Sequence, residues 1–384
     1  MRHGGRLGEQ FVMVFDLPTG VILVTVVLFD VFESVILPRR AGNMFRLAPH
    51  VLALLWPVWR RIGLRLQPAW RREDFLGTFA PLAIVLLLVL WFAGLIVGFG
   101  LILHAMHDQL LPPIVDYETA FYMAGTSLLT IGFGDVVATA GPARFAVVFA
   151  GAAGLTIVAL VIALTFNLYA SFARREVLVL ALDARAGVPP SGVVLLETYG
   201  RYRIPDELAA MFAQFELWTA ETLDSHLAYP PLMFFRSSHD GQSWISALGA
   251  VLDAATLLIT AVPEAAEVDG DSLRKSRAGA KMFYSIGCHA LVDLTQLRIA
   301  GGLSKLAAPS PGIERSEFET ACHRLAEAGY PVSASETAWQ AFAERRSAYA
   351  ARLNLLATYF ASPPTQWIGD RTMLERVHAP HFGN

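Results

Sequence analysis

Two long runs without a charged residue constrain this chain more than any other feature. Residues 75–106 and 145–173 contain no Asp, Glu, Lys or Arg and are rich in Leu, Val and Ile. A bilayer's hydrocarbon core is about 30 Å thick, so about 20 apolar residues rising about 1.5 Å each cross it as a helix. Both runs are therefore predicted membrane spans. Only 16% of the residues are charged, whereas soluble domains have about a quarter. This low charge content agrees with a membrane protein.

A third predicted span runs from Pro18 to Leu37. Pro18 suits the first turn of a helix, and Pro38 suits its end. Asp30 and Glu33 lie one turn apart on one face, and each would cost about 2.5–3.5 kcal/mol at the bilayer centre. We expect them to form ion pairs with arginines of the next segment, and the alternative is a role in an ion pathway.

The distribution of arginine predicts the orientation in the membrane, because short loops rich in Lys and Arg stay in the cytoplasm. Residues 38–74 are rich in arginine, whereas residues 104–143 contain neither Arg nor Lys. We therefore expect a multi-pass protein of the plasma (inner) membrane. Its N-terminus is predicted to be external, and residues 176–384 are predicted to be cytoplasmic.

The segment between the two uncharged runs carries the most informative motif. Residues 117–129 are predicted to form a helix too short to span, capped by Asp116. It is followed by Thr130-Ile131-Gly132-Phe133-Gly134-Asp135. Glycine at alternate positions permits backbone dihedrals closed to other residues, so successive carbonyl groups can point the same way. The alternative is a plain hairpin turn.

In this setting the motif resembles the selectivity filter of potassium channels, and residues 76–175 resemble the two-helix pore domain of that family. The resemblance implies that K⁺ binds at Thr130, Ile131, Gly132 and Phe133, and that Gly134 completes the filter. It also places Asp135 at the external mouth, where a carboxylate attracts cations.

Four positions depart from the family pattern. Phe133 replaces the commoner tyrosine of the filter. Thr126 stands where some prokaryotic members have a glutamate that binds the filter aspartate. Tyr122 and Met123 stand where paired tryptophans often brace the filter, so the resemblance does not say what supports it here.

One filter segment per chain implies a homotetramer, because the ion must be surrounded. The helix 145–173 is then expected to line the pore, with residues 76–103 facing lipid. Gly154 is a candidate gating hinge, or a small residue that lets helices pack closely. Thr165 and Asn167 are candidate inner-pore residues, and Asn167 could equally form a hydrogen bond between helices.

The segment 46–72 mixes tryptophan with arginine, a composition typical of a helix along the inner membrane interface. We expect it to contact membrane lipids. Arg60, Arg61 and Arg65 are candidate contacts to anionic lipid, and the alternative is an Arg and Trp belt that only anchors the neighbouring spans.

Residues 176–384 are predicted to form an all-α domain. Apolar residues recur with helical period over 206–226, 244–262, 278–299, 314–328 and 335–360. The run 244–262 is apolar enough to span, but Asp253 lies in its middle, so we predict a buried core helix. There is no Gly-x-Gly-x-x-Gly motif of a nucleotide-binding domain, so the regulator of this domain is unknown.

These observations predict an all-α membrane protein that is a K⁺-selective channel and not an enzyme. We expect no cofactor, with K⁺ as the permeant ion, and the balanced charge gives no sign of nucleic-acid binding. The alternatives are a subunit of a potassium transporter, or a non-conducting signalling or scaffold protein. The predicted parts are an N-terminal span, an interfacial linker, the pore domain and a helical domain, over residues 1–37, 38–74, 75–175 and 176–384.

Overall fold

The computed structural model describes residues 3–37, 47–238, 241–263, 271–297 and 313–363. The chain divides into two compact units. Unit 1 comprises residues 1–51 and 81–168, and unit 2 comprises residues 52–80 and 169–384. Both units are built from helices, which confirms the all-α class. The four-part division predicted from the sequence stays a prediction, and the structure groups residues 52–80 with the C-terminal helices.

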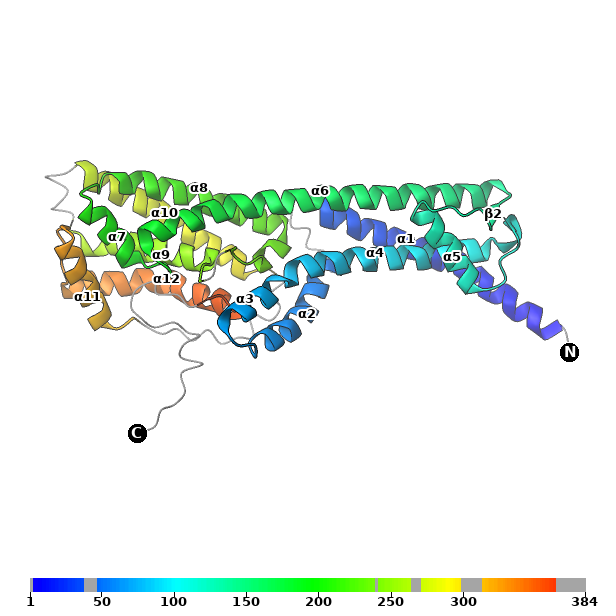
Figure 1. Ribbon diagram of the computed structural model, residues 1–384, viewed down its shortest axis with the longest axis horizontal. Coiled ribbons are helices and arrows are strands. Elements are labelled where there is room, and N and C mark those ends of the chain that lie inside the picture. Colours follow the sequence, from blue (N-terminus) through cyan, green and yellow to red (C-terminus); the bar gives the residue numbers. More distant parts are fainter. Residues whose placement is uncertain (1–2, 38–46, 239–240, 264–270, 298–312, 364–384) are drawn as a thin grey trace, which may run out of the picture. The chain divides into compact units, whose positions relative to one another are not determined.

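Unit 1 is formed around three long helices and one short one (Figure 1). The long helices are α1 (His3–Val35), α4 (Phe79–Ala105) and α6 (Gly141–Ala186), and the short helix is α5 (Tyr117–Leu128). A 3₁₀ turn, η1 (His107–Gln109), leads to β1 (Leu110–Leu111), which pairs antiparallel with β2 (Val137–Ala138).

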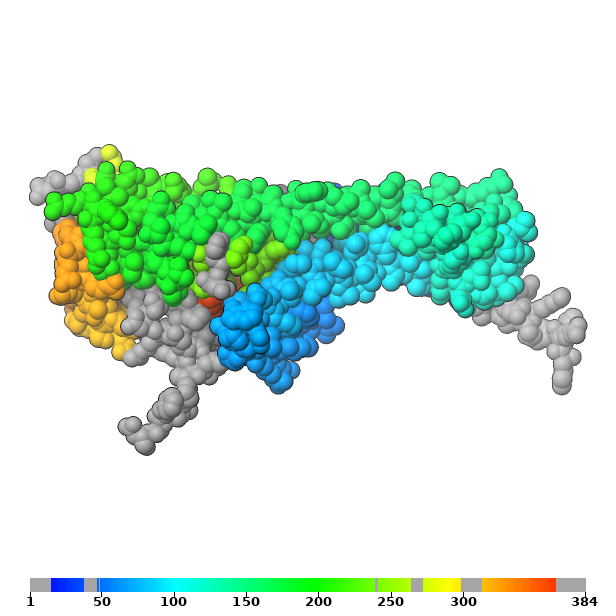
Figure 2. Space-filling model, viewed as in Figure 1, coloured from blue at the N-terminus to red at the C-terminus, as the bar shows by residue number. Residues whose placement is uncertain are grey.

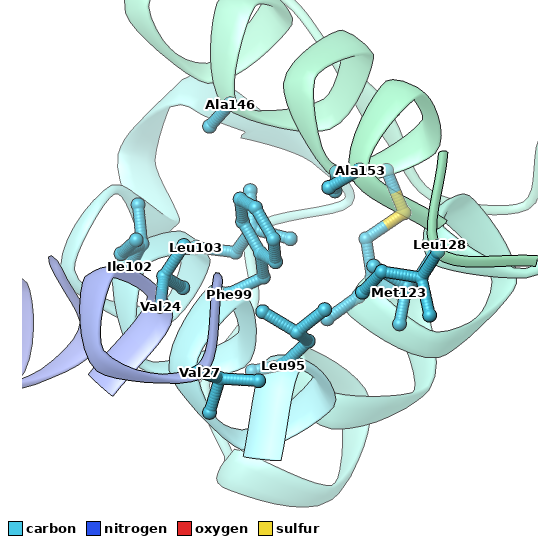
Figure 3. Close-up of a cluster of buried hydrophobic side chains, with 14 of the residues drawn as sticks. Val24, Val27, Leu95, Phe99, Ile102, Leu103, Met123, Leu128, Ala146 and Ala153 are labelled. Atoms are coloured by element: carbon cyan, nitrogen blue, oxygen red, sulfur yellow. The ribbon is translucent and has the colours of Figure 1, made fainter. Parts of the chain in front are cut away.

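The core of unit 1 is an apolar cluster to which α1, α4, α5 and α6 all contribute. In Figure 3 the ring of Phe99 lies among side chains of the neighbouring helices, with Val24 of α1 on one side and Met123 of α5 on the other. Helices α1 and α4 approach closely at Gly20, where a Cβ would lie 2.6 Å from the Gly98 carbonyl oxygen. Small residues permit such close packing in membrane helices.

Unit 2 is a bundle of helices. In Figure 1, α8 (Glu207–Ala228), α9 (Trp244–Ala261), α10 (Asp271–Thr295) and α12 (Glu336–Phe360) lie side by side. The other elements are α2 (Leu47–Gly63, from residue 52 onward), α3 (Ala69–Gly77), α7 (Gly192–Arg201), η2 (Pro230–Phe234) and α11 (Arg315–Glu327). Helix α7 was not predicted, because Pro189 and Pro190, shortly before its N-cap Ser191, indicated a break.

Four helices among the described residues are long and apolar enough to cross a membrane by length and composition. They are Phe15–Val35, Ala69–Ala105, Gly141–Ala186 and Trp244–Ala261. The last of these has 94% of its residues buried within the protein. As predicted, α9 is a core helix of its unit, in contact with α7, α8, α10 and α12.

A charged network explains why Asp253 is tolerated in the middle of α9. Its side chain is fully buried. Arg346 Nε donates to Asp253 Oδ1 over 3.2 Å, the Tyr349 hydroxyl donates to the same oxygen, and Thr256 Oγ1 lies 3.1 Å from the Tyr349 hydroxyl. A buried carboxylate with a cation and a hydroxyl as partners avoids the cost of an unpaired buried charge.

Two predicted helix boundaries were wrong. Helix α1 begins at His3 and contains Pro18, whereas the sequence predicted a start at Pro18. Helix α6 continues past residue 173 to Ala186 and has 46 residues. At about 1.5 Å per residue it is about 69 Å long, more than twice the thickness of a hydrocarbon core.

Candidate functional site

The short helix α5 is positioned by its N-terminal cap, as the sequence predicted. The Asp116 carboxylate accepts hydrogen bonds from the backbone N–H of Thr119 over 2.7 Å and from its hydroxyl over 3.0 Å. The bond from the backbone N–H is the main reason why the pKa of Asp116 is lowered. A carboxylate at this end also complements the helix dipole. The opposite end of α5 therefore points its partial negative charge toward the segment that follows.

The predicted filter segment begins directly after α5 and has no regular secondary structure. The backbone N–H groups of Ile131 and Gly132 both donate to the Thr126 carbonyl oxygen, over 2.8 and 3.3 Å. Ile131 is 50% exposed and Phe133 is 68% exposed. Thr126, at the position of the family's glutamate, is buried, and its hydroxyl donates to the Met123 carbonyl oxygen.

The sign of φ alternates along this segment. It is positive at Thr130 (58°), Gly132 (58°) and Gly134 (77°), and not at Ile131 or Phe133. Glycine adopts such values at little cost. For Thr130, a β-branched residue, a positive φ is a genuine outlier of the kind that clusters at functional sites.

Tyr122 connects α5 to the predicted filter segment. Its ring stacks on that of Phe133, with centroids 6.4 Å apart and planes 1° from parallel. A hydrogen bond between its hydroxyl and Asp135 is the main cause of the raised pKa of Tyr122. Met123, in contrast, is buried in the core of unit 1. One residue, Tyr122, thus contacts both Phe133 of the predicted filter and Asp135 of its predicted mouth.

We expect Tyr122→Phe to loosen the filter mouth without unfolding the protein. The phenylalanine ring keeps the stacking on Phe133 and loses the hydrogen bond to Asp135, so the K⁺ over Na⁺ permeability ratio should fall several-fold. Reversal potentials of reconstituted protein would measure it. Tyr202→Phe, at an exposed position in unit 2, is the matched control. An unchanged ratio would contradict a bracing role for the hydroxyl.

The loop after the predicted filter segment is fixed by backbone and side-chain hydrogen bonds to Gln109, the last residue of η1. The Thr139 N–H donates to the Gln109 carbonyl oxygen over 2.8 Å, and the Ala143 N–H donates to Gln109 Oε1 over 3.3 Å. Val136 is buried beside Asp135. Residues 130–134 therefore lie between two anchored points, the C-terminus of α5 and the β1–β2 ladder.

Gly154 of α6 lies against the C-terminus of α5. A Cβ at this position would come 1.8 Å from the Leu128 carbonyl oxygen and 2.8 Å from its carbonyl carbon. Figure 3 shows Leu128 near the adjacent Ala153. This contact supports the close-packing interpretation of Gly154. The hinge stays a prediction, and α6 is helical through this position.

The other inner-pore candidates lie further along α6. The Thr165 hydroxyl donates to the Val161 carbonyl oxygen over 2.8 Å, within its own helix. Asn167 is exposed. Side chains of α6 lie at the surface along much of the face seen in Figure 2, and its exposed apolar residues include Phe145, Val148 and Leu155.

A polar cluster that the sequence analysis did not find connects α1, α4 and α5. His104 Nδ1 lies 2.7 Å from Asp16 Oδ2, and the Tyr117 hydroxyl donates to the same oxygen over 3.2 Å. The rings of His104 and Tyr117 stack with centroids 4.2 Å apart. Asp16 and His104 are both buried. The N-terminal helix is thereby bound to the first residue of α5.

Asp30 and Glu33 of α1 are both 2% exposed. Asp30 accepts hydrogen bonds from Trp91 Nε1 over 2.6 Å and from the backbone N–H of Leu47 over 2.7 Å. These donors lower the cost of a carboxylate in an apolar unit. The predicted ion pairs with arginine stay a prediction, and Arg39, Arg40 and Arg46 lie outside the described residues.

The linker helices α2 and α3 pack against the C-terminal helices of unit 2. Trp56 Nε1 donates to the Tyr359 carbonyl oxygen over 3.0 Å, and Arg60 Nη2 donates to that of Thr358 over 2.9 Å. Arg236 Nε donates to Glu73 Oε2 over 2.8 Å. These contacts were not predicted.

The arginines predicted to contact anionic lipid differ in their surroundings. The guanidinium of Arg60 donates hydrogen bonds to the Thr358 carbonyl oxygen, and burial lowers the pKa of Arg60. Arg61 and Arg65 are exposed. Lipid contact of the three stays a prediction, and Arg61 and Arg65 are the two whose exposure favours it.

Arg175, two residues after the second charge-free run, is buried within unit 2 at 3% exposure. Its guanidinium donates to the carbonyl oxygens of Leu232 and Phe235 over 3.1 and 2.8 Å, and its Nη1 lies 3.1 Å from His226 Nε2. Burial and then the nearby Arg175 lower the pKa of His226 to about 3. The neutral ring accepts from Arg175 at Nε2 and donates from Nδ1 to the Thr222 carbonyl oxygen over 2.6 Å.

Together, a short capped helix, a glycine-punctuated segment with alternating φ and two long apolar helices define an all-α membrane protein with a pore-type domain. A family model described as an ion channel matches residues 84–171. The match identifies residues 84–171 as an ion-channel domain and supports a pore domain of the potassium-channel type there. No curated protein and no solved structure matches the chain.

Proposed function

We propose that this protein is a K⁺-selective channel that conducts K⁺ passively through a pore formed around residues 130–134. The alternation of φ at Thr130, Gly132 and Gly134 is the observation that supports this most strongly. In an ordinary extended strand, successive carbonyl groups point to opposite sides. Alternation between positive and negative φ brings them to one side, as needed to replace the hydration shell of an ion.

In this proposal K⁺ is bound by the carbonyl oxygens of Thr130, Ile131, Gly132 and Phe133, and the Thr130 hydroxyl adds an oxygen beneath them. Gly134 supplies the last turn of backbone, and Asp135 holds the mouth through its hydrogen bond with Tyr122. The C-terminus of α5 adds partial negative charge below the filter. No charged side chain has to bind the ion.

The proposed assembly is a homotetramer, because one filter segment cannot surround an ion. The large exposed apolar area of α6 and the exposure of Ile131 and Phe133 support contacts with further copies. Closed rotational symmetry would place four equivalent segments around one axis. Part of α6 would then line the pore, with Thr165 and Asn167 toward its inner end.

We further propose that the C-terminal helices are cytoplasmic and regulate the pore, in the plasma membrane. Helix α6 is continuous between the filter region and the Arg175 network. A change in the packing around Arg175 and His226 therefore acts on the helix proposed to line the pore. The orientation follows the arginine-rich loop at residues 38–74.

Mass and flux of the purified full-length protein test this proposal. We expect a mass of four chains in detergent, and K⁺ flux into liposomes that barium blocks. A tetramer without barium-sensitive flux would favour a non-conducting scaffold and contradict the channel. Flux that requires a coupled ion gradient or ATP would favour a transporter subunit.

A further inference from the structure

A polar cleft of about 400 Å³ lies in unit 2 at the C-terminal end of α9, between α10 and α12. Its walls include Ile259 to Ala261 of α9 and the segment just before α12. The polar side chains that line it, apart from Thr260, are three cations and three hydroxyl groups: Arg277, Lys281, Arg345, Ser333, Ser335 and Thr337. No Asp or Glu is among the described lining residues.

The three cations come from two helices and are held in different ways. Arg277 and Lys281 lie four residues apart on one face of α10. Arg277 is 8% exposed, and its Nη2 donates to the Ile259 carbonyl oxygen over 2.8 Å. The Arg345 guanidinium of α12 lies over the ring of Tyr284, 5.7 Å from its centroid. Three positive groups around one cleft favour an anionic occupant.

The hydroxyl wall is fixed by the start of α12. Ser335 caps this 25-residue helix by accepting from the Ala338 N–H over 3.2 Å. The Ser333 N–H donates to the Ala261 carbonyl oxygen over 2.7 Å, which ties the segment before the helix to the end of α9. The dipole of α12 adds to the positive potential. Glu336 in its first turn offsets part of this, although Glu336 itself pairs with Arg315.

We propose that this cleft binds a soluble phosphate monoester of about nucleotide size. Arginine and lysine bind phosphate oxygens by charge-assisted hydrogen bonds, and the hydroxyl wall suits the sugar hydroxyls of such a ligand. The volume is within the range of small-molecule sites, about 300–1,000 Å³, and is much larger than inorganic phosphate needs. The ligand would hold α9, α10 and α12 together.

The position of the cleft suggests what binding would do. Helix α12 carries Ser335 and Arg345 toward the cleft, and its C-terminal end accepts the hydrogen bonds from Trp56 and Arg60 of α2. A ligand that orders α12 therefore acts on the helix against which the linker packs. This effect on the linker is separate from ligand binding, and the test of binding does not depend on it.

Calorimetry and thermal unfolding of the detergent-purified full-length protein test the proposal, with adenosine 5′-monophosphate, ribose 5-phosphate, inorganic phosphate and adenosine as probes. We expect both monoesters to bind and to raise the unfolding midpoint, and adenosine not to bind. Lys281→Gln and Arg345→Gln, both at exposed positions, should each weaken binding about tenfold. Lys275→Gln, exposed on another face of α10, is the charge-matched control and should bind normally.

Three outcomes would overturn the proposal. One is that neither monoester binds. Another is that Lys281→Gln and Arg345→Gln bind as the unchanged protein or the Lys275→Gln control does, which would place binding elsewhere. The third is that dioctanoyl phosphatidic acid binds and the soluble monoesters do not, which would assign the cleft to a lipid headgroup. Because conduction is not measured, failure here would leave the proposed channel activity untouched.

Discussion

Replacement of Gly132 by alanine is expected to abolish K⁺ conduction while leaving the tetramer assembled. Gly132 has φ of 58°, and a Cβ at this position would have no other atom within 4 Å in the protomer. The cost is therefore backbone strain of about 1–2 kcal/mol for an L-residue with positive φ, not a clash. This strain is too small to unfold the protein. We expect residue 132 to change its φ to relieve the strain, and this change turns a carbonyl group away from the neighbouring carbonyl groups.

Flux into liposomes and the mass in detergent would be measured on the same preparation of Gly132→Ala. Gly125→Ala on α5 is the matched control, because its Cβ would meet only Ile96 at 3.8 Å, an ordinary contact. Alanine in the middle of a helix is also favoured over glycine, so this variant should conduct normally. Retained K⁺ selectivity in Gly132→Ala would contradict the assignment of backbone carbonyl groups as ligands.

The sequence predicted best those elements whose signals are local. The uncharged runs around α4 and α6 identified both helices, and Asp116 identified the start of α5, because a span or a cap depends only on neighbouring residues. The helical period likewise located α8 to α12. The glycine spacing in residues 130–134 predicted backbone dihedrals closed to other residues, and Gly132 and Gly134 adopt positive φ, while the filter itself stays a proposal.

Contacts between residues distant in the sequence could not be predicted. A start at Pro18 is the usual pattern, but Asp16 forms tertiary contacts with His104 and Tyr117, and α1 extends beyond the proline. The burial of Arg175 was likewise not predicted, because its partners are distant in the sequence. Its hydrogen bonds go to carbonyl groups about sixty residues away, at Leu232 and Phe235.

The arginine-rich linker shows that composition alone does not identify the partners of a residue within the fold. Trp and Arg together indicate a membrane interface, and the same residue types also bind exposed carbonyl groups at a helix C-terminus. Arg60 contacts the last turn of α12, at Thr358, which lies 298 residues further along the chain. The interfacial position of this helix stays a prediction, and the fold shows that Arg60 contacts α12.

Gly154→Ala is expected to destabilise the pore domain by about 1–3 kcal/mol or more, the usual cost of inserting a methyl group into a packed site. The obstacle is the backbone carbonyl of Leu128, 1.8 Å from the added Cβ, so no side chain can move aside. Helix α5 must shift instead, and the filter begins two residues after Leu128. The variant should therefore show a lower thermal midpoint of the tetramer and impaired K⁺ selectivity.

Gly151→Ala, one turn earlier on α6, separates packing from hinge motion. Its Cβ would lie 3.4 Å from the Ser127 carbonyl oxygen, so we expect a midpoint close to that of the unchanged protein. A hinge at Gly154 predicts a different result for Gly154→Ala, namely an unchanged midpoint with an altered open probability. Measuring both quantities on both variants discriminates the two roles, because a clash lowers stability in every gating state, whereas a lost hinge changes only the balance between those states.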